Sequence, residues 1–513
     1  MKKTCCLYAW VAVVVWALGQ AAAEPAGGAA GKAPVLKHSE IVFMSAADDE
    51  SYKAYRATFV GWGGANTKEQ VERHHKLGIR CTGSMWCLTA GAKRLHENPE
   101  LLGAVAVDIE GKPIAVPWLF DHTYQGTPSY FGCTNSPAFR AHNRDMVRQQ
   151  MAGGADGLHV DDHMGVSHAA HWQGGGLCDH CMAAFRGWLK AHAGEAAIAK
   201  QLKDAGVADI EKFDYRDIIR KHAKTRAEYK KVQRKIPLMD LFLRFHGETA
   251  AENVRQLGEL ATQVAGHPTL LSANAGLPSN AHAYVLPKLT HVICEVGQNA
   301  ASGTGGIGHA IEGYRMAARL DRPLAATASG HDWAFANENN PHDLVRFWVA
   351  LAYAHGQRFM VPHPKRQWCF TSQKGTHWYA APVNEFAPVY QFISGNAAWF
   401  DGFEEDASDA GLKAVAAIQR PKTVLCALRR RADGAAALHV LNLDYDKDAK
   451  RFRPAEKISL RLPASLLPGG ASKARLLSYD AKETQVALAR EAGQARIDLP
   501  ALRLWTIVAI PKP

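Results

Sequence analysis

The sequence predicts an α/β protein that consists of a (β/α)8 TIM barrel followed by a C-terminal antiparallel β-sandwich domain. Between residues 41 and 401, short apolar runs alternate with segments of helical periodicity, an order that favours a parallel sheet covered by helices. From residue 402 to 513, short apolar runs are separated by turn residues, which is typical of a small antiparallel domain. We therefore expect two domains, 41–401 and 402–513.

The N-terminus has the pattern of a secretory signal peptide. Lys2 and Lys3 precede the apolar stretch LYAWVAVVVWALG, which is followed by the small residues of QAAAEP. We expect residues 1–23 to be removed after Ala23, and residues 24–40, rich in Gly, Ala and Pro, to form a flexible leader. The apolar stretch is shorter than the ~20 residues of a spanning helix, so the prediction is an exported protein, periplasmic or extracellular, without a membrane span. An uncleaved anchor is the alternative.

Composition and charge narrow the class of partner. Hydrophobic residues make up 47% and charged residues 21% of the chain, as in an ordinary globular protein. The formal net charge of +11 could attract an anionic or sulfated glycan, or could only solvate the surface. The basic stretch 215–235 lacks the interleaved aromatic residues of a nucleic-acid groove, so no nucleic-acid partner is expected.

Seven apolar runs have the length of barrel strands. They cover residues 57–64, 78–86, 157–163, 269–276, 290–297, 323–330 and 358–364, with helical patterns at 67–78, 136–154, 238–266 and 341–356. An eighth strand, which would close a barrel, is expected between 102 and 120, although VAVDIEGKPIAVPW (105–118) also fits a loop hairpin. An open doubly wound sheet is the alternative, but no Gly-rich phosphate loop follows the first strand.

Two aspartates end the strand predicted at 157–163. In GLHVDD, side-chain alternation turns Leu158 and Val160 outward, and His159 and Asp161 toward the barrel axis. Asp161 therefore lies at the C-terminal end of a strand, where barrel active sites are built. Asp162 begins the loop, so capping is its alternative role, and we keep it as the second catalytic candidate.

A second carboxylate closes another apolar strand. In HVICEVGQ, Glu295 points inward with His291 and Ile293, and burial there would raise its pKa, as a general acid requires. Two carboxylates from separate strands are the minimal set for cleaving a glycosidic bond. A structural ion pair is the alternative for Glu295, in which case Asp332 or Glu338 would be the acid.

Aromatic and polar residues near other strand ends are candidates for binding a sugar. Tryptophan stacks on sugar rings, and polar groups bind hydroxyls, although each of these residues alone is more often a packing residue. The substrate-binding candidates are Trp62, Trp86, His159, His163, Asn274, His331, Asp332, Trp333, His363, Lys365 and Trp368.

The segments GCTNSPAFRAHNRDMVRQQMAGGADGLHVDDHMG (132–165) and CDHCMAAFRGWL (178–189) carry a family resemblance. They resemble glycosyl-hydrolase-like (β/α)8 barrels related to family 151 α-L-fucosidases and family 42 β-galactosidases. The shared features are an Asn-x-Pro helix start, Asp-Gly before a strand that ends in Asp, and Cys-x-x-Cys followed by Phe and a helix. The resemblance is clear over residues 105–190 and looser over 236–365.

The resemblance implies a retaining glycoside hydrolase with Asp161 as nucleophile, exo-acting on α-L-fucosides or galactosides of polysaccharides. The chain departs from family 42, whose fourth strand ends in Asn-Glu, and this leaves the sugar open. A non-catalytic glycan-binding protein on the same barrel is the alternative. A metal-dependent hydrolase is disfavoured because the chain has neither HExxH nor a His-x-His at a first strand, so no catalytic cofactor is expected.

Cys178 and Cys181 form a Cys-x-x-Cys pair just before a predicted helix. In the similar family 42 enzymes a comparable cluster holds a structural zinc ion, and here Cys133 and His180 could complete the ligand set. A disulfide or free thiols are the alternative reading of an isolated pair in an exported protein.

Overall fold

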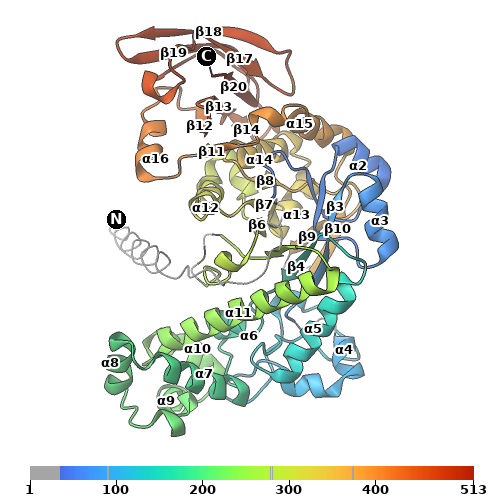
Figure 1. Ribbon diagram of the computed structural model, residues 1–513, viewed down its shortest axis with the longest axis vertical. Coiled ribbons are helices and arrows are strands. Elements are labelled where there is room, and N and C mark those ends of the chain that lie inside the picture. The colour runs from blue at the N-terminus through green and yellow to red at the C-terminus, as the bar shows by residue number, and fades with distance from the viewer. Residues whose placement is uncertain (1–34, 89–91, 278, 280, 372–374, 513) are drawn as a thin grey trace. The chain divides into compact units, whose positions relative to one another are not determined.

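The computed structural model describes residues 35–512 except 89–91, 278, 280 and 372–374 (Figure 1). The predicted signal peptide and residues 24–34 of the predicted leader lie outside the described residues. The rest of that leader packs against the protein: Leu36 and Glu40 are buried, and the Arg358 side chain donates hydrogen bonds to the carbonyls of Leu36 and Lys37, both 2.8 Å long. In the part of the chain that is described, no helix is long and apolar enough to cross a membrane.

Eight parallel strands form the predicted barrel. They are β1 (Val42–Ser45), β2 (Phe59–Gly63), β3 (Arg80–Trp86), β4 (Gly157–Asp161), β5 (Leu270–Ala273), β6 (Val292–Val296), β7 (Leu324–Ala328) and β8 (Arg358–Phe359). The strands pair in chain order from β1 to β5 and from β6 to β8. A parallel bridge between Asn274 and Ile293 joins β5 to β6, and Val361 N–H donates to Val42 O over 2.8 Å, which closes the ring from β8 to β1.

The expected position of the eighth strand was wrong. The missing strand is β1, a run of four residues, and the described part of 102–120 contains no strand. Residues 105–118 instead form the hairpin-like loop that was the alternative, with single antiparallel bridges such as Val107 to Pro113. Asp108 explains this local fold, because its Oδ1 accepts from the backbone N–H groups of Glu110 (2.9 Å) and Lys112 (3.0 Å) and turns the chain back.

The four predicted helical segments are all present. They are α3 (Lys68–Lys76), α5 (Pro137–Met151), α11 (Met239–Ala265) and α14 (His342–Ala354). Local signals set their ends: Thr67 and Gln70 form a capping box on α3, Pro137 is the first residue of α5, and Gly266 stops α11 in the left-handed conformation. The remaining helices around the barrel are α2 (Asp49–Tyr55), α4 (Ala92–Glu97), α12 (Gly308–Arg319), α13 (Gly330–Asn339) and α15 (Val383–Gly395).

A long helical insertion separates β4 from α11. It contains α6 (Val166–His168), the π-helix η3 (Ala169–Gln173), α7 (Asp179–His192), α8 (Ala196–Asp204), α9 (Tyr215–His222) and α10 (Arg226–Val232). Figure 1 shows α7 to α10 packed beside α11. This insertion has its own apolar core, which includes Phe185, Tyr215 and Phe242. The basic stretch 215–235 forms amphipathic helices here and buries Ile219 and Tyr229, which explains its pattern without a polyanion.

The C-terminal region is antiparallel, as predicted. Its strands are β11 (Phe403–Glu405), β12 (Val424–Arg431), β13 (Ala436–Asn442), β16 (Ala455–Pro463), β17 (Lys473–Leu477), β18 (Thr484–Glu491), β19 (Gln494–Leu502) and β20 (Trp505–Ile510). The first half of β18 pairs with β17 and its second half with β19, so these eight strands make one curled sheet around an apolar core. Smaller elements are the hairpins β9 (Gln367–Thr371) with β10 (Gly375–Tyr379) and β14 (Tyr445–Asp446) with β15 (Arg451–Phe452), and helix α16 (Asp409–Ala416).

Candidate active site

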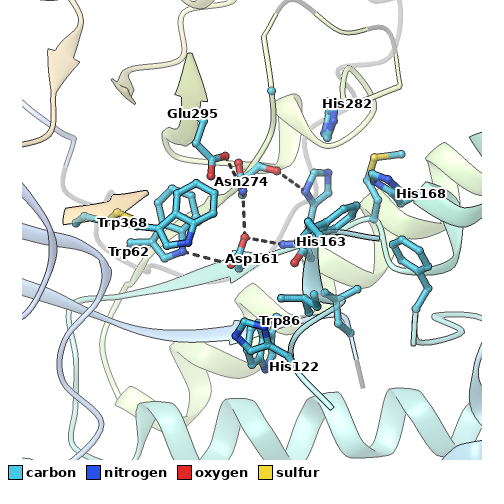
Figure 2. Close-up of a pocket in the computed structure, with 18 of the residues that line it drawn as sticks. Trp62, Trp86, His122, Asp161, His163, His168, Asn274, His282, Glu295 and Trp368 are labelled. Atoms are coloured by element: carbon cyan, nitrogen blue, oxygen red, sulfur yellow. Dashed lines mark hydrogen bonds between the residues drawn. The ribbon is translucent and has the colours of Figure 1, made fainter. Parts of the chain in front are cut away.

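A cavity of about 610 Å³ lies at the C-terminal ends of the barrel strands (Figure 2). It brings together eight of the residues predicted from the sequence: Trp62, Trp86, Asp161, Asp162, His163, Asn274, Glu295 and Trp368. Figure 2 shows Trp62 and Trp368 on one side of Asp161, and His163, His168 and His282 on the other. The cavity therefore combines carboxylates with aromatic side chains, the residue types that a sugar site requires.

Asp161 ends β4 and is held by three hydrogen-bond donors. Its Oδ1 accepts from Asn274 Nδ2 (3.1 Å) and from the backbone N–H of Asp162 (2.9 Å), and its Oδ2 accepts from Trp62 Nε1 (3.4 Å). Burial raises the pKa of the Asp161 carboxyl, whereas these three donors favour the ionised form and lower it. His159, two residues earlier, also points inward but is fully buried beneath the cavity, with its ring 4.9 Å from that of Trp62.

Glu295, on β6, is the second carboxylate of the cavity. Its Oε2 accepts from Asn274 Nδ2 over 3.2 Å. Burial, and then the negative charge of Asp161, raise the pKa of Glu295 to about 7, while the Asn274 bond acts in the opposite direction. A carboxyl group with this pKa can hold a proton near neutral pH and release it, as a general acid must.

Asn274 links the two carboxylates through a single side-chain nitrogen. Its own position is fixed by the backbone, because its N–H donates to Val160 O (3.3 Å) and its carbonyl accepts from His163 Nδ1 (3.1 Å). Because both oxygens are bonded to this one nitrogen, at 3.1 and 3.2 Å, they lie no more than 6.3 Å apart. Carboxyl groups ~5–5.5 Å apart are typical of retaining glycosidases, and 6.5–9.5 Å of inverting ones.

Asp162 follows Asp161 in a left-handed backbone conformation, with φ of 44°. Its carbonyl accepts from the N–H of Gly165 (3.0 Å), which closes a tight turn, and its side chain lines the cavity. Burial, and then the charges of Asp161 and Glu295, raise the pKa of Asp162 well above its ordinary value. A neutral carboxyl in this position can donate a hydrogen bond to a sugar hydroxyl.

Two other predicted residues lie on α13, which follows β7, and do not line the cavity. Asp332 is buried and accepts from the backbone N–H groups of Gln298 and Ala300, both at 2.8 Å. Trp333 is in the core and donates from Nε1 to Thr327 Oγ1 over 2.9 Å. His331 lines a separate hollow together with Asp332, and Glu338 on α13 is not among the residues that line the carboxylate cavity.

His363 and Lys365 also lie outside the set that lines the cavity. His363 is buried, and its Nδ1 accepts from the backbone N–H of Lys365 (3.1 Å) and of Arg366 (2.9 Å), which shapes the turn after β8. The exposed ammonium of Lys365 forms an ion pair with Asp48, with 2.7 Å between Nζ and Oδ2. These contacts give both residues a structural role.

Several cavity residues were not predicted from the sequence. They are Met44, Leu88, Trp118, Leu119, His122, Phe131, Met164, His168, Gly276, His282 and Trp378. Most lie in the loops that follow β3, β4 and β5, and the dense run HMGVSHAAHW (163–172) was the available signal for Met164 and His168. Burial lowers the pKa of His168 to about 3 and that of His282 to about 4, so both rings are neutral near pH 7.

Cys133, Cys178 and Cys181 form a buried cluster at the start of α7. Their sulfur atoms lie 3.4, 3.4 and 3.6 Å from one another, too far apart for an S–S bond of about 2.05 Å. A tetrahedral zinc ion with Zn–S bonds of about 2.3 Å places its sulfur ligands about 3.8 Å apart, so the three thiols fit zinc. His180 is exposed and does not belong to the cluster.

The chain is similar in sequence to two curated α-agarases. The chain is 23% identical to an α-agarase of Alteromonas agarilytica over 310 residues, which cover 58% of this chain and 20% of that protein. It is 25% identical to an α-agarase of Thalassotalea agarivorans over 305 residues, 55% of this chain and 19% of that protein. The matches thus span about a fifth of the length of these curated relatives. No protein-family model matches the chain.

One solved structure shares the fold at low sequence identity, and a second superposes less well. A cycloisomaltooligosaccharide glucanotransferase of Paenibacillus sp., in complex with cycloisomaltoheptaose, superposes with a TM-score of 0.56 at 9% identity over 92% of this chain and 84% of that one. An α-L-fucosidase of Paenibacillus thiaminolyticus has a TM-score of 0.48 at 10% identity, over 93% of this chain and all of that one. The first of these superpositions shows that the chain has the barrel fold expected from the sequence.

Proposed function

We propose that the protein is a retaining glycoside hydrolase that uses Asp161 as nucleophile and Glu295 as acid and base. The observation that carries this proposal is the amide of Asn274, which bonds one oxygen of each carboxylate and keeps the two oxygens within 6.3 Å of each other. That spacing leaves room for a sugar carbon but not for an additional water, as retention requires.

The two carboxyl groups have the environments that these roles need. Asp161, with three donors around it, is stabilised as the anion that attacks the anomeric carbon. Glu295, with its raised pKa, delivers its proton to the leaving oxygen as the glycosidic C–O bond breaks and the bond to Asp161 Oδ forms. In the second step Glu295 takes a proton from water, whose oxygen displaces Asp161 and releases the sugar.

The substrate we propose is an α-galactosidic bond in an uncharged, agar-type polysaccharide. The similarity to two α-agarases supports the α-linkage and the polymer. None of the described residues that line the cavity is Lys or Arg, whereas three are carboxylic acids, and this favours a neutral glycan over the sulfated or anionic one considered from net charge.

Export and a structural zinc ion complete the proposal. The N-terminal pattern around Lys2 and Lys3 supports a protein that acts outside the cytoplasm, where such polysaccharides are found. Cys133, Cys178 and Cys181 would hold zinc, which would tie α7 to the loop before α5. Because these thiols are not among the residues that line the cavity, the chemistry is assigned to carboxylates alone.

A polysaccharide panel tests the proposal. The full-length protein is incubated with agarose, a sulfated galactan and nitrophenyl α-L-fucoside, and new reducing ends are measured. We expect cleavage of agarose, and proton NMR at early times should show the α-anomer as the first product. The β-anomer as first product would contradict retention, and tight binding without any cleavage would identify a glycan-binding protein instead.

A further inference from the structure

Three large aromatic side chains are more than a third exposed among the described residues: Phe120 (45%), Trp172 (38%) and Trp378 (53%). All three belong to the surroundings of the carboxylate cavity. Trp378 lines it, Phe120 follows the lining residue Leu119, and Trp172 packs against two lining histidines. Single exposed aromatic side chains are common on protein surfaces. Several that gather at one cavity indicate a binding surface.

Trp172 is rigidly presented by an unusual backbone. It lies in the π-helix η3, and single-turn π-helices are frequent at functional sites. Its ring lies 4.5 Å from that of His168, 5.5 Å from that of His171 and 5.8 Å from that of His282, measured between centroids. A side chain fixed in this way loses little conformational entropy when a ligand stacks on it.

The neighbours of Trp172 continue into the cavity. His168 stacks on Phe131, with 5.0 Å between centroids and 14° between the ring planes. His282 lines the cavity, and its buried Nδ1 has no hydrogen-bond partner among the residues that the structure describes. A sugar hydroxyl would satisfy that nitrogen, and the histidine ring faces would pack against the C–H groups of a sugar.

We propose that Trp172, supported by His168 and His282, is the stacking platform of a distal subsite for a further sugar ring of the same neutral glycan. This inference rests on the proposed function and extends it. In Figure 2, His168 and His282 lie on one side of Asp161 and Trp368 on the other. A further sugar ring on this platform would make binding depend on the length of the glycan.

Binding to a protein that cannot turn over tests the platform separately from catalysis. In the Glu295→Gln background, calorimetry is used to compare a neutral disaccharide and a neutral hexasaccharide prepared from agarose. Trp172→Ala should weaken the binding of the hexasaccharide by about 3- to 10-fold, which is the typical contribution of one aromatic contact. It should also lower the ratio of hexasaccharide affinity to disaccharide affinity. Trp172→Tyr should restore most of that ratio, because an aromatic face is retained.

Leu102→Ala is the matched control, since Leu102 is also exposed (48%) and apolar but does not line the cavity. It should leave both affinities within twofold of the parent. Hexasaccharide binding that is equally strong with Trp172→Ala would overturn the platform and leave the proposed function standing. If the parent bound neither oligosaccharide and the wild-type protein did not cleave agarose, the proposed function and the platform would both fall.

Discussion

Asp161 and Glu295 share one hydrogen-bond donor, the side-chain amide of Asn274, with N···O distances of 3.1 and 3.2 Å. The two carboxylates come from β4 and β6, which do not pair with each other, and this amide links them at the rim of the barrel. The charge of Asp161 raises the pKa of Glu295, so Glu295 keeps its proton to a higher pH than it would beside a neutral group. A general acid requires such a proton.

The raised pKa of Glu295 has a cost in stability that its removal should relieve. The pKa is about 7 in the folded protein against 4.5 ordinarily, so the unfolded chain ionises first as pH rises and stability falls between these values. Glu295→Gln cannot ionise and should be more stable than the wild type above pH 7, by about 3 kcal/mol at most, and equally stable below pH 4.5. Thermal midpoints at pH 4, 6 and 8 measure the difference.

Glu100→Gln is the control for that experiment, because Glu100 is an exposed glutamate away from the cavity. Its thermal midpoint should follow that of the wild type at every pH. If the thermal midpoint of Glu295→Gln also equalled that of the wild type at every pH, Glu295 would have an ordinary pKa. It would then not be the general acid.

Kinetics of the same variant test the acid role directly. The activity of the wild type should fall as pH rises through about 7, because the acid must be protonated in the free enzyme. Glu295→Gln should lose at least ~10²-fold in kcat/KM on the natural glycan but much less on a dinitrophenyl glycoside, whose leaving group needs no proton. The basic limb of the pH profile should also flatten. Equal losses on both substrates with an unchanged profile would indicate a structural Glu295.

Asp161→Asn should abolish turnover by at least ~10³-fold on both substrates while the protein stays folded. The substitution keeps the shape of the side chain and removes the nucleophilic charge, so the reason for the loss is chemical rather than structural. Asp332→Asn is the contrasting variant, because that carboxylate accepts from two backbone N–H groups outside the cavity. It should lower the thermal midpoint with a smaller effect on kcat/KM, which would rule out Asp332 as the acid.

Asn274→Ala tests the shared donor. The hydrogen bonds from Asn274 lower the pKa of both carboxyl groups. Their loss should raise both pKa values and move the basic limb of the pH profile to higher pH. The rate at the optimum should fall by roughly 10- to 100-fold, since the variant also loses the amide that sets the spacing. A lower rate with an unmoved basic limb would mean that Asn274 only binds substrate.

The barrel and its two carboxylates could be predicted because both follow from regular rules. Alternation along β4 and β6 decides which residues face the axis, and parallel strands bring their C-terminal ends to one rim, so Asp161 and Glu295 converge whatever the loops do. The same rule failed for Trp333 and His363, which also lie near strand ends. Their hydrogen bonds, to Thr327 and to the backbone of Lys365, hold them in the core and in a turn.

The rest of the site could not be predicted because loops have no periodicity. Trp118, His282 and Trp378 reach the cavity from segments whose conformation depends on long-range packing. Strand β1 was missed although it is as long as β5, which was predicted. The π-helix that presents Trp172 is likewise invisible in the sequence, since one extra residue in a helical turn leaves the composition unchanged.

The three-cysteine cluster supports a last prediction, that the protein as isolated contains about one zinc ion per chain, held by Cys133, Cys178 and Cys181. The double change of Cys178 and Cys181 to Ser should remove the zinc, measured by elemental analysis, and lower the thermal midpoint by several degrees, because a structural metal contributes to folding. The pH profile of the remaining activity should keep its shape, since the carboxylates that determine it lie elsewhere. Cys426→Ser, which changes another buried thiol, should leave the zinc content unaltered. Zinc retained by the double variant would place the metal at other ligands, and a loss of activity at unchanged stability would instead give this cluster a part in the reaction.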